Sequence, residues 1–180
     1  MKTILQTCLV LLVFTVLTGA LYPAGVWAIG RIAWPEQANG NVTLIGQKFE
    51  KERYFFSRPS ASDYGAVPSS ASNLGPTSAV LKVAIAKRRA DLAAKHSARP
   101  EDVPSDLLTS SASGLDPHIS VAAAHFQVGR VAKARRLNAE QSAQLTLLVD
   151  KHVEGPQWGL FGDPRVNVLQ LNRAVDEAFH

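Results

Sequence analysis

The sequence predicts an α+β protein in which one N-terminal transmembrane helix is followed by a single helix-rich extracytoplasmic domain with a few short strands. Three observations support this: residues 3–30 contain no charged side chain, helical hydrophobic periodicity recurs in several later stretches, and the segments 42–45 and 49–56 are rich in β-branched and aromatic residues. We therefore divide the 180 residues into a transmembrane anchor (1–30), a linker (31–40) and one extracytoplasmic domain (41–180).

The anchor is long enough to cross a bilayer. About 20 apolar residues, each rising ~1.5 Å, span a hydrocarbon core of ~30 Å. Lys2 precedes the run and Arg31 follows it, while Tyr22, Trp27 and Trp34 cluster at its far end, where aromatic rings favour the headgroup layer.

A cleaved signal peptide is the alternative, because Thr18-Gly19-Ala20 offers the small residues that a signal peptidase accepts. The apolar character continues past Ala20, which favours an uncleaved anchor. Only Lys2 and the amino terminus precede the helix, which favours a cytoplasmic N-terminus and a domain outside. The predicted location is a bacterial inner membrane, crossed once, with the C-terminal domain in the periplasm. Cys8 lies in the anchor, so the outer domain has no thiol.

One face of the anchor carries small residues. Thr15, Thr18 and Gly19 fall near one side, and Thr15 and Gly19 have the small-xxx-small spacing that lets another transmembrane helix approach closely. The alternative, that lipid simply tolerates Thr and Gly here, stays open.

In the domain, two short strands are predicted at 42–45 and 49–56. The polar loop from 57 to 76 is long for a compact domain, and such loops are often functional, so we interpret it as an ordered binding loop. A helix from Thr77 to His96, capped by Thr77 or Ser78, and a short strand at 107–109 follow.

Three further helices are predicted. Asp116 followed by Pro117 favours a helix start and a helix to about Arg136. Asn138, with Gln141 three residues on, opens the next helix as a capping box, which Gly155 and Pro156 end. Asn167 caps a last helix, whose inner face is Val168, Leu171, Val175 and Phe179.

The charge pattern argues against nucleic-acid binding. The 19 Lys and Arg exceed the 15 Asp and Glu by only four, and the basic residues are scattered among acids instead of forming one basic face. We predict that the basic residues at 87–89 and 130–136 lie on solvated helix faces.

No catalytic, metal-binding or cofactor-binding residue is predicted. The sequence contains neither G-x-x-x-x-G-K-[ST] nor G-x-G-x-x-G, the usual phosphate-binding patterns. Its histidines lack the short paired spacing of metal sites. A hydrolase could be built from Ser113, Asp116 and His118, but no G-x-S-x-G elbow surrounds Ser113. An anchored or secreted periplasmic hydrolase, or a released periplasmic binding domain, remains the alternative.

Several motifs resemble those of one known family, the C subunit of the bacterial Kdp potassium-transporting ATPase. They occur in order along most of the chain: Tyr54-Phe55-Phe56-Ser57-Arg58-Pro59-Ser60, Ser72-Asn73-Leu74-Gly75-Pro76, the run from Val103 to Ser120, Gln127 with Arg130 to Arg135, and Pro164 to Leu169 with Leu171-Asn172. Arg136 stands where the family commonly has Gly.

The resemblance implies a non-catalytic subunit of an ATP-driven potassium pump. The implied partners are a channel-like potassium-translocating subunit, a P-type catalytic subunit and a small single-helix subunit. Family roles include raising the ATP affinity of the catalytic subunit and standing over the channel-like subunit to aid assembly or K⁺ entry. ATP and K⁺ would be handled by the partners, because ATP lies on the opposite side of the membrane from the predicted domain. Partner-contact or structural roles are expected for Arg58, Ser72, Asn73, Asp116, His118 and Arg165.

Overall fold

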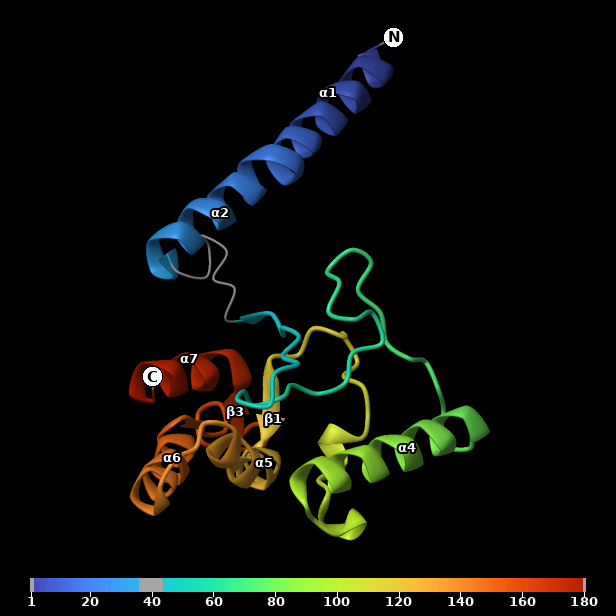
Figure 1. Cartoon of the computed structure of the whole chain (residues 1–180). Coiled ribbons are helices and arrows are strands. Elements are labelled where there is room, and N and C mark those ends of the chain that lie inside the picture. Colours follow the sequence, from blue (N-terminus) through green and yellow to red (C-terminus); the bar gives the residue numbers. More distant parts are fainter. Residues whose placement is uncertain (1, 36–43, 180) are drawn as a thin grey trace. The chain divides into compact units, whose positions relative to one another are not determined.

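The computed structural model describes residues 2–35 and 44–179, which fall into two compact units that divide between Val42 and Thr43 (Figure 1). The first unit is one long apolar helix and the second a small α+β domain with a three-stranded sheet, so the predicted α+β class is confirmed.

The first unit is one helix of 32 residues, Lys2–Ala33, with no buried residue. It consists of α1 (Lys2–Val16), a π-helical segment η1 (Leu17–Leu21) and α2 (Tyr22–Ala33). The wider turn ends two residues before Pro23, whose ring would clash with the carbonyl four residues earlier, that of Gly19, in a regular α-helix. The proline therefore loosens the helix without ending it, and the helix continues three residues beyond the predicted end at Gly30.

In the second unit, the helices α5 (Val121–Ala134), α6 (Ala139–Lys151) and α7 (Val168–Ala178) pack around a small sheet (Figure 1). The strands β1 (His118–Ser120), β2 (Val153–Glu154) and β3 (Arg165–Asn167) pair antiparallel in the order β1-β3-β2. Their shared core includes the fully buried side chains Phe55, Ile119, Leu145, Val166, Leu171 and Val175.

Local capping signals locate two of these helices correctly. Asn138 and Gln141 form the predicted capping box of α6, and the Asn167 side chain accepts hydrogen bonds from the first turn of α7. The predicted helix start at Asp116 is wrong. β1 intervenes, and Ser120 caps α5 by accepting a hydrogen bond from the Ala123 N–H.

The helix α4 (Ala79–His96) begins after Ser78, as predicted, and ends at Ser97 in the left-handed conformation. The 3₁₀ turns η3 (Pro100–Asp102) and η4 (Ser105–Leu107) follow it. The predicted strand at 107–109 is therefore wrong. η4 places Leu107 in the main core, while Ala93, Val103 and Leu108 form a second small cluster.

The two predicted strands at 42–45 and 49–56 are also not borne out. Positions 42 and 43 lie outside the described residues, and residues 44–56 contain no strand. Side-chain amides replace strand pairing here. The Asn172 side chain binds the Phe55 N–H at 2.8 Å and its carbonyl at 3.0 Å, and Gln127 binds the N–H and carbonyl of Phe56 at 2.7 and 3.1 Å. The segment thus satisfies its backbone groups through helices α5 and α7.

The prediction that the basic residues at 130–136 lie on solvated helix faces is wrong for Arg130 and Arg135. Arg130 is only 6% exposed, lies 3.8 Å from the Phe56 ring centroid and donates to the Tyr54 carbonyl, Gln127 and His96. Arg135 lies at the end of the same helix, and its side chain is 3% exposed and bound to Asp176. Arg135 Nε also donates to the Arg53 carbonyl at 2.9 Å, so both guanidinium groups hold the 52–56 segment against the helices.

Candidate functional site

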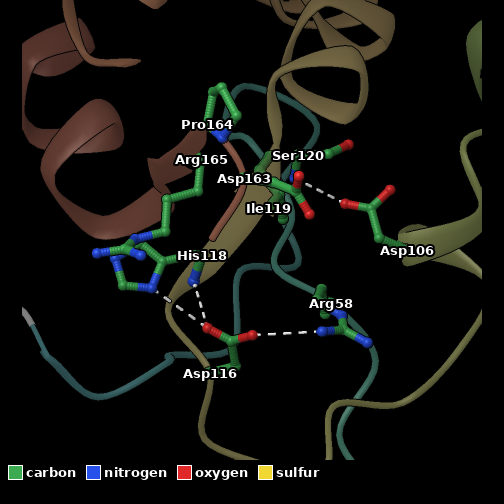
Figure 2. A pocket seen from close by; sticks show the side chains of 9 residues that line it. All are labelled: Arg58, Asp106, Asp116, His118, Ile119, Ser120, Asp163, Pro164 and Arg165. Atoms are coloured by element: carbon green, nitrogen blue, oxygen red, sulfur yellow. Dashed lines mark hydrogen bonds and ion pairs between the residues drawn. The ribbon is translucent and has the colours of Figure 1, made fainter. Parts of the chain in front are cut away.

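A charged pocket lies beside the small sheet and has a volume of about 460 Å³. It brings together the loop that follows residue 56, the 106–120 segment and the start of β3 (Figure 2). Its lining residues are Arg58, Asp106, Asp116, His118, Ile119, Ser120, Asp163, Pro164 and Arg165.

Asp116 links Arg58 to His118 in this pocket. Its Oδ2 accepts a hydrogen bond from Arg58 Nη1 at 3.3 Å. Its Oδ1 lies 3.0 Å from the His118 backbone N–H and 3.3 Å from His118 Nδ1 (Figure 2). The carboxylate therefore fixes a local turn, an arrangement that Asp favours outside helices, and also joins two segments 58 residues apart.

The pKa of the Asp116 carboxyl lies below its ordinary value of 3.8. Partial burial acts to raise this pKa, but the hydrogen bonds from the side chain and backbone of His118, together with the electrostatic influence of His118 and Arg58, outweigh it. Asp116 is therefore an anion at neutral pH.

A second carboxylate completes the network. His118 Nε2 lies 3.5 Å from Glu154 Oε2, and Arg165 Nε donates to the same oxygen at 3.2 Å. The sheet register places these groups, because Arg165 on β3 is paired with Glu154 on β2 and with Ser120 on β1. His118 is thus held between two carboxylates, one at each ring nitrogen.

Close backbone packing holds the Asp116 loop. The Gly46 N–H donates to the Leu115 carbonyl at 2.7 Å, and a Cβ at position 46 would lie 2.7 Å from the Asp116 carbonyl oxygen. On the other side, Asp106 accepts a hydrogen bond from the Ser120 N–H at 2.8 Å. Only glycine fits at position 46 without displacing the loop.

The structure brings four of the six predicted site residues together: Arg58, Asp116, His118 and Arg165. Ser72 and Asn73 do not line this pocket. Both are exposed in the polar loop, and Asn73 has a φ of 52°, the left-handed conformation that Asn tolerates in turns.

Sequence reasoning missed Asp106, Glu154 and Asp163. Asp106 lies inside the motif from Val103 to Ser120, and Asp163 directly precedes the motif that begins at Pro164. Their positions in the sequence could therefore have indicated that they belong to the site. Glu154 had no such signal, because its role depends on the pairing of β2 with β3.

The geometry does not favour a hydrolase. A nucleophilic serine needs a base within hydrogen-bond reach, whereas both ring nitrogens of His118 face carboxylates. The Ser113 hydroxyl instead accepts a hydrogen bond from the Leu115 N–H at 3.1 Å. Among residues 2–35 and 44–179 no group of three or more His, Cys, Asp or Glu side chains is placed to hold a metal ion. The arrangement is an ion-pair network in which the carboxylates of Asp116 and Glu154 lie against Arg58, His118 and Arg165.

Comparison with known proteins identifies the family. The family model for the K⁺-transporting ATPase c chain matches residues 4–177. Similar proteins include the potassium-transporting ATPase KdpC subunits of Dechloromonas aromatica, 45% identical over 98% of each chain, and of Paraburkholderia phytofirmans, 44% identical over the full length of both. That of Herpetosiphon aurantiacus is 44% identical over 98% of this chain and 97% of its own. The chain therefore belongs to the K⁺-transporting ATPase c chain family.

Proposed function

We propose that this chain is the non-catalytic, single-pass subunit of an ATP-driven potassium uptake complex, and that it supports assembly and turnover of the pump. Its N-terminus is cytoplasmic and its C-terminal domain periplasmic. Full-length membership of the c chain family carries this proposal. The apolar helix Lys2–Ala33 supports the anchor, because none of its side chains is buried within the chain and lipid or partner helices must cover them.

The anchor offers a packing face for a partner helix. The Thr15 and Thr18 hydroxyls donate to the Leu11 and Phe14 carbonyls of the helix itself, so their polar groups are satisfied without a partner. A Cβ at Gly19 would meet nothing within 4 Å. This leaves a small, smooth surface where another transmembrane helix can approach closely.

ATP and K⁺ are handled by the partner subunits in this proposal. The partners are a channel-like potassium-translocating subunit, a P-type catalytic subunit and a small single-helix subunit. The periplasmic domain lies across the membrane from ATP, so an effect on the ATP affinity of the catalytic subunit passes through the anchor. Such coupling requires only that the anchor contacts two states of the partner differently. Calorimetry that detects tight ATP binding to the full-length chain in nanodiscs overturns this assignment.

The charged pocket is proposed as a contact for a periplasmic surface of a partner. Arg58, Asp116, His118 and Arg165 present both signs of charge at one surface depression, and matched charges give an interface its specificity and register. Ser72 and Asn73 lie on the exposed polar loop and are proposed as further contacts.

Co-purification tests the proposal. An affinity-tagged chain, extracted from the membrane in mild detergent, should recover the untagged translocating and catalytic subunits of the pump. Gly19→Leu should reduce this recovery because it fills the packing face, whereas Ala24→Leu, on a different side of the helix, should not. Failure of the wild-type chain to recover either subunit overturns the proposal.

A second pair of variants separates partner contact from folding at the pocket. Arg165→Gln should lower recovery of the pump subunits while leaving thermal unfolding nearly unchanged. Arg99→Gln removes an exposed ion pair with Asp102 elsewhere on the domain and should change neither quantity. Equal recovery with Arg165→Gln and the wild type removes the pocket from the interface.

A further inference from the structure

An uncharged turn between β2 and β3 presents large apolar side chains to solvent. Trp158, Leu160 and Phe161 are 88%, 79% and 61% exposed, and residues 155–162 contain no charged side chain. Apolar surface concentrated in this way usually marks an interaction site. These three side chains neither line the charged pocket nor belong to the hydrophobic core of the domain.

The turn has a defined structure. Gln157 and Phe161 form an isolated antiparallel bridge, with the Gln157 N–H donating to the Phe161 carbonyl at 2.8 Å and the return bond at 3.0 Å. The Gly159 and Leu160 N–H groups donate to the Pro156 and Gln157 carbonyls. These bonds fix the apolar side chains at the tip of the turn.

The backbone of the tip is tightly curved. Trp158 has a φ of 53°, which is rare for a residue other than Gly, and the next residue, Gly159, has a φ of 74°. The Trp158 ring packs edge-on against the Phe161 ring with centroids 6.1 Å apart. The two aromatic side chains therefore form one convex apolar tip.

A lipid surface fits this tip better than a charged partner does. Trp favours the membrane–water interface, and the internally paired N–H groups of the turn lower the cost of placing it there. The proposed anchor also limits how far the domain can lie from the bilayer. Helix α2 ends at Ala33, the described domain begins at Leu44, and the chain between them spans at most roughly 40 Å even when fully extended.

We propose that the 156–161 tip inserts shallowly into the outer face of the bilayer as a second membrane contact of the domain. This inference relies on the proposed anchoring of Lys2–Ala33 in the same bilayer. The acidic residues Glu154 and Asp163 flank the tip, so attraction to anionic headgroups contributes little. Insertion is therefore insensitive to added salt and to the fraction of anionic lipid.

Fluorescence quenching in lipid nanodiscs tests the proposal. The full-length chain carries one native thiol, Cys8, and its labelled form reports whether the anchor is in the bilayer. In a Cys8→Ser background, Leu160→Cys carries the same environment-sensitive label on the tip. The matched control is Leu147→Cys, on an exposed position of α6. Lipids with a nitroxide near the headgroup should remove most of the fluorescence at position 160 and little at 147, at low and high salt alike.

Three results would overturn the inference, and they can be told apart. Quenching at Cys8 without quenching at position 160 refutes tip insertion and leaves the anchor intact. Quenching at neither position refutes the anchor as well. Quenching at position 160 that disappears when the pump subunits are co-assembled identifies a protein surface, and not lipid, as the occupant of the tip in the complex.

Discussion

Asn172→Leu should detach the 52–56 segment from helix α7 and destabilise the domain. Asn172 is 2% exposed, and its amide binds both the N–H and the carbonyl of Phe55. Leucine has a similar volume but no polar atoms, so it fills the space and leaves both backbone groups unpaired. The segment leads directly to Arg58, so the same change should also loosen the charged pocket.

The size of the effect follows from the two lost bonds. A buried polar group left without a partner costs about 1–3 kcal/mol, and two such groups cost roughly 2–6 kcal/mol. Burying the leucine side chain returns about 1–2 kcal/mol. The net loss is centred near about 2.5 kcal/mol, a large part of the 5–15 kcal/mol typical of folded proteins. It should lower the Tm by about 10 °C for a domain of this size.

Thermal unfolding of the full-length chain in detergent, followed by circular dichroism, measures the Tm. Hydrogen exchange of the 52–58 peptide reports whether the segment has come loose. Gln170→Leu is the matched control, because Gln170 is exposed on the same helix and the change should fall within about 0.5 kcal/mol of the wild type. An Asn172→Leu chain as stable as the Gln170→Leu chain would refute the role assigned to the side-chain amide.

Three other predictions concern the same domain. Gly46→Ala should destabilise the domain by about 1–3 kcal/mol in denaturant unfolding, because the added Cβ would meet the Asp116 carbonyl oxygen. Gly155→Ala, which has open space around it, should change the stability little. Equal stabilities of the two variants would contradict this prediction. Burial keeps the pKa of folded His96 below its ordinary value of 6.5, so below about pH 6.5 the unfolded chain binds a proton that the folded chain does not. The free energy of unfolding should therefore fall less steeply on acidification in His96→Gln than in the wild type. Parallel pH profiles of the two proteins would refute this prediction. Arg136→Gly should raise the Tm, because Arg136 has a φ of 56° and glycine adopts that conformation at about 1 kcal/mol lower cost; a lower Tm would contradict this.

Local signals explain which elements the sequence predicts correctly. The cap residues Ser78, Asn138 and Asn167 act within a few residues of themselves, and the helices after them begin as expected. The segment 49–56 has the composition of a strand, but its partners are the amides of Gln127 and Asn172, 71 and 117 residues away. Composition cannot show that side chains, and not a neighbouring strand, satisfy its backbone.

The same contrast holds at the charged pocket. Motif resemblance singled out Arg58, Asp116, His118 and Arg165, which the fold brings together. It did not show that Asp116 joins Arg58 to His118, because the Asp-Pro pair also fits a helix start. Glu154 was missed because strand register, which depends on the whole sheet, places it beside Arg165.

Protease accessibility in intact spheroplasts tests the central claim most directly, namely that the helix Lys2–Ala33 stays in the bilayer with the remainder of the chain outside the cytoplasm. A full-length chain with a C-terminal tag is exposed to external protease, with a cytoplasmic protein as the control for leakage. We expect loss of the tag and survival of a short membrane-bound N-terminal fragment. A tag that survives until the cells are opened would show that the domain lies in the cytoplasm.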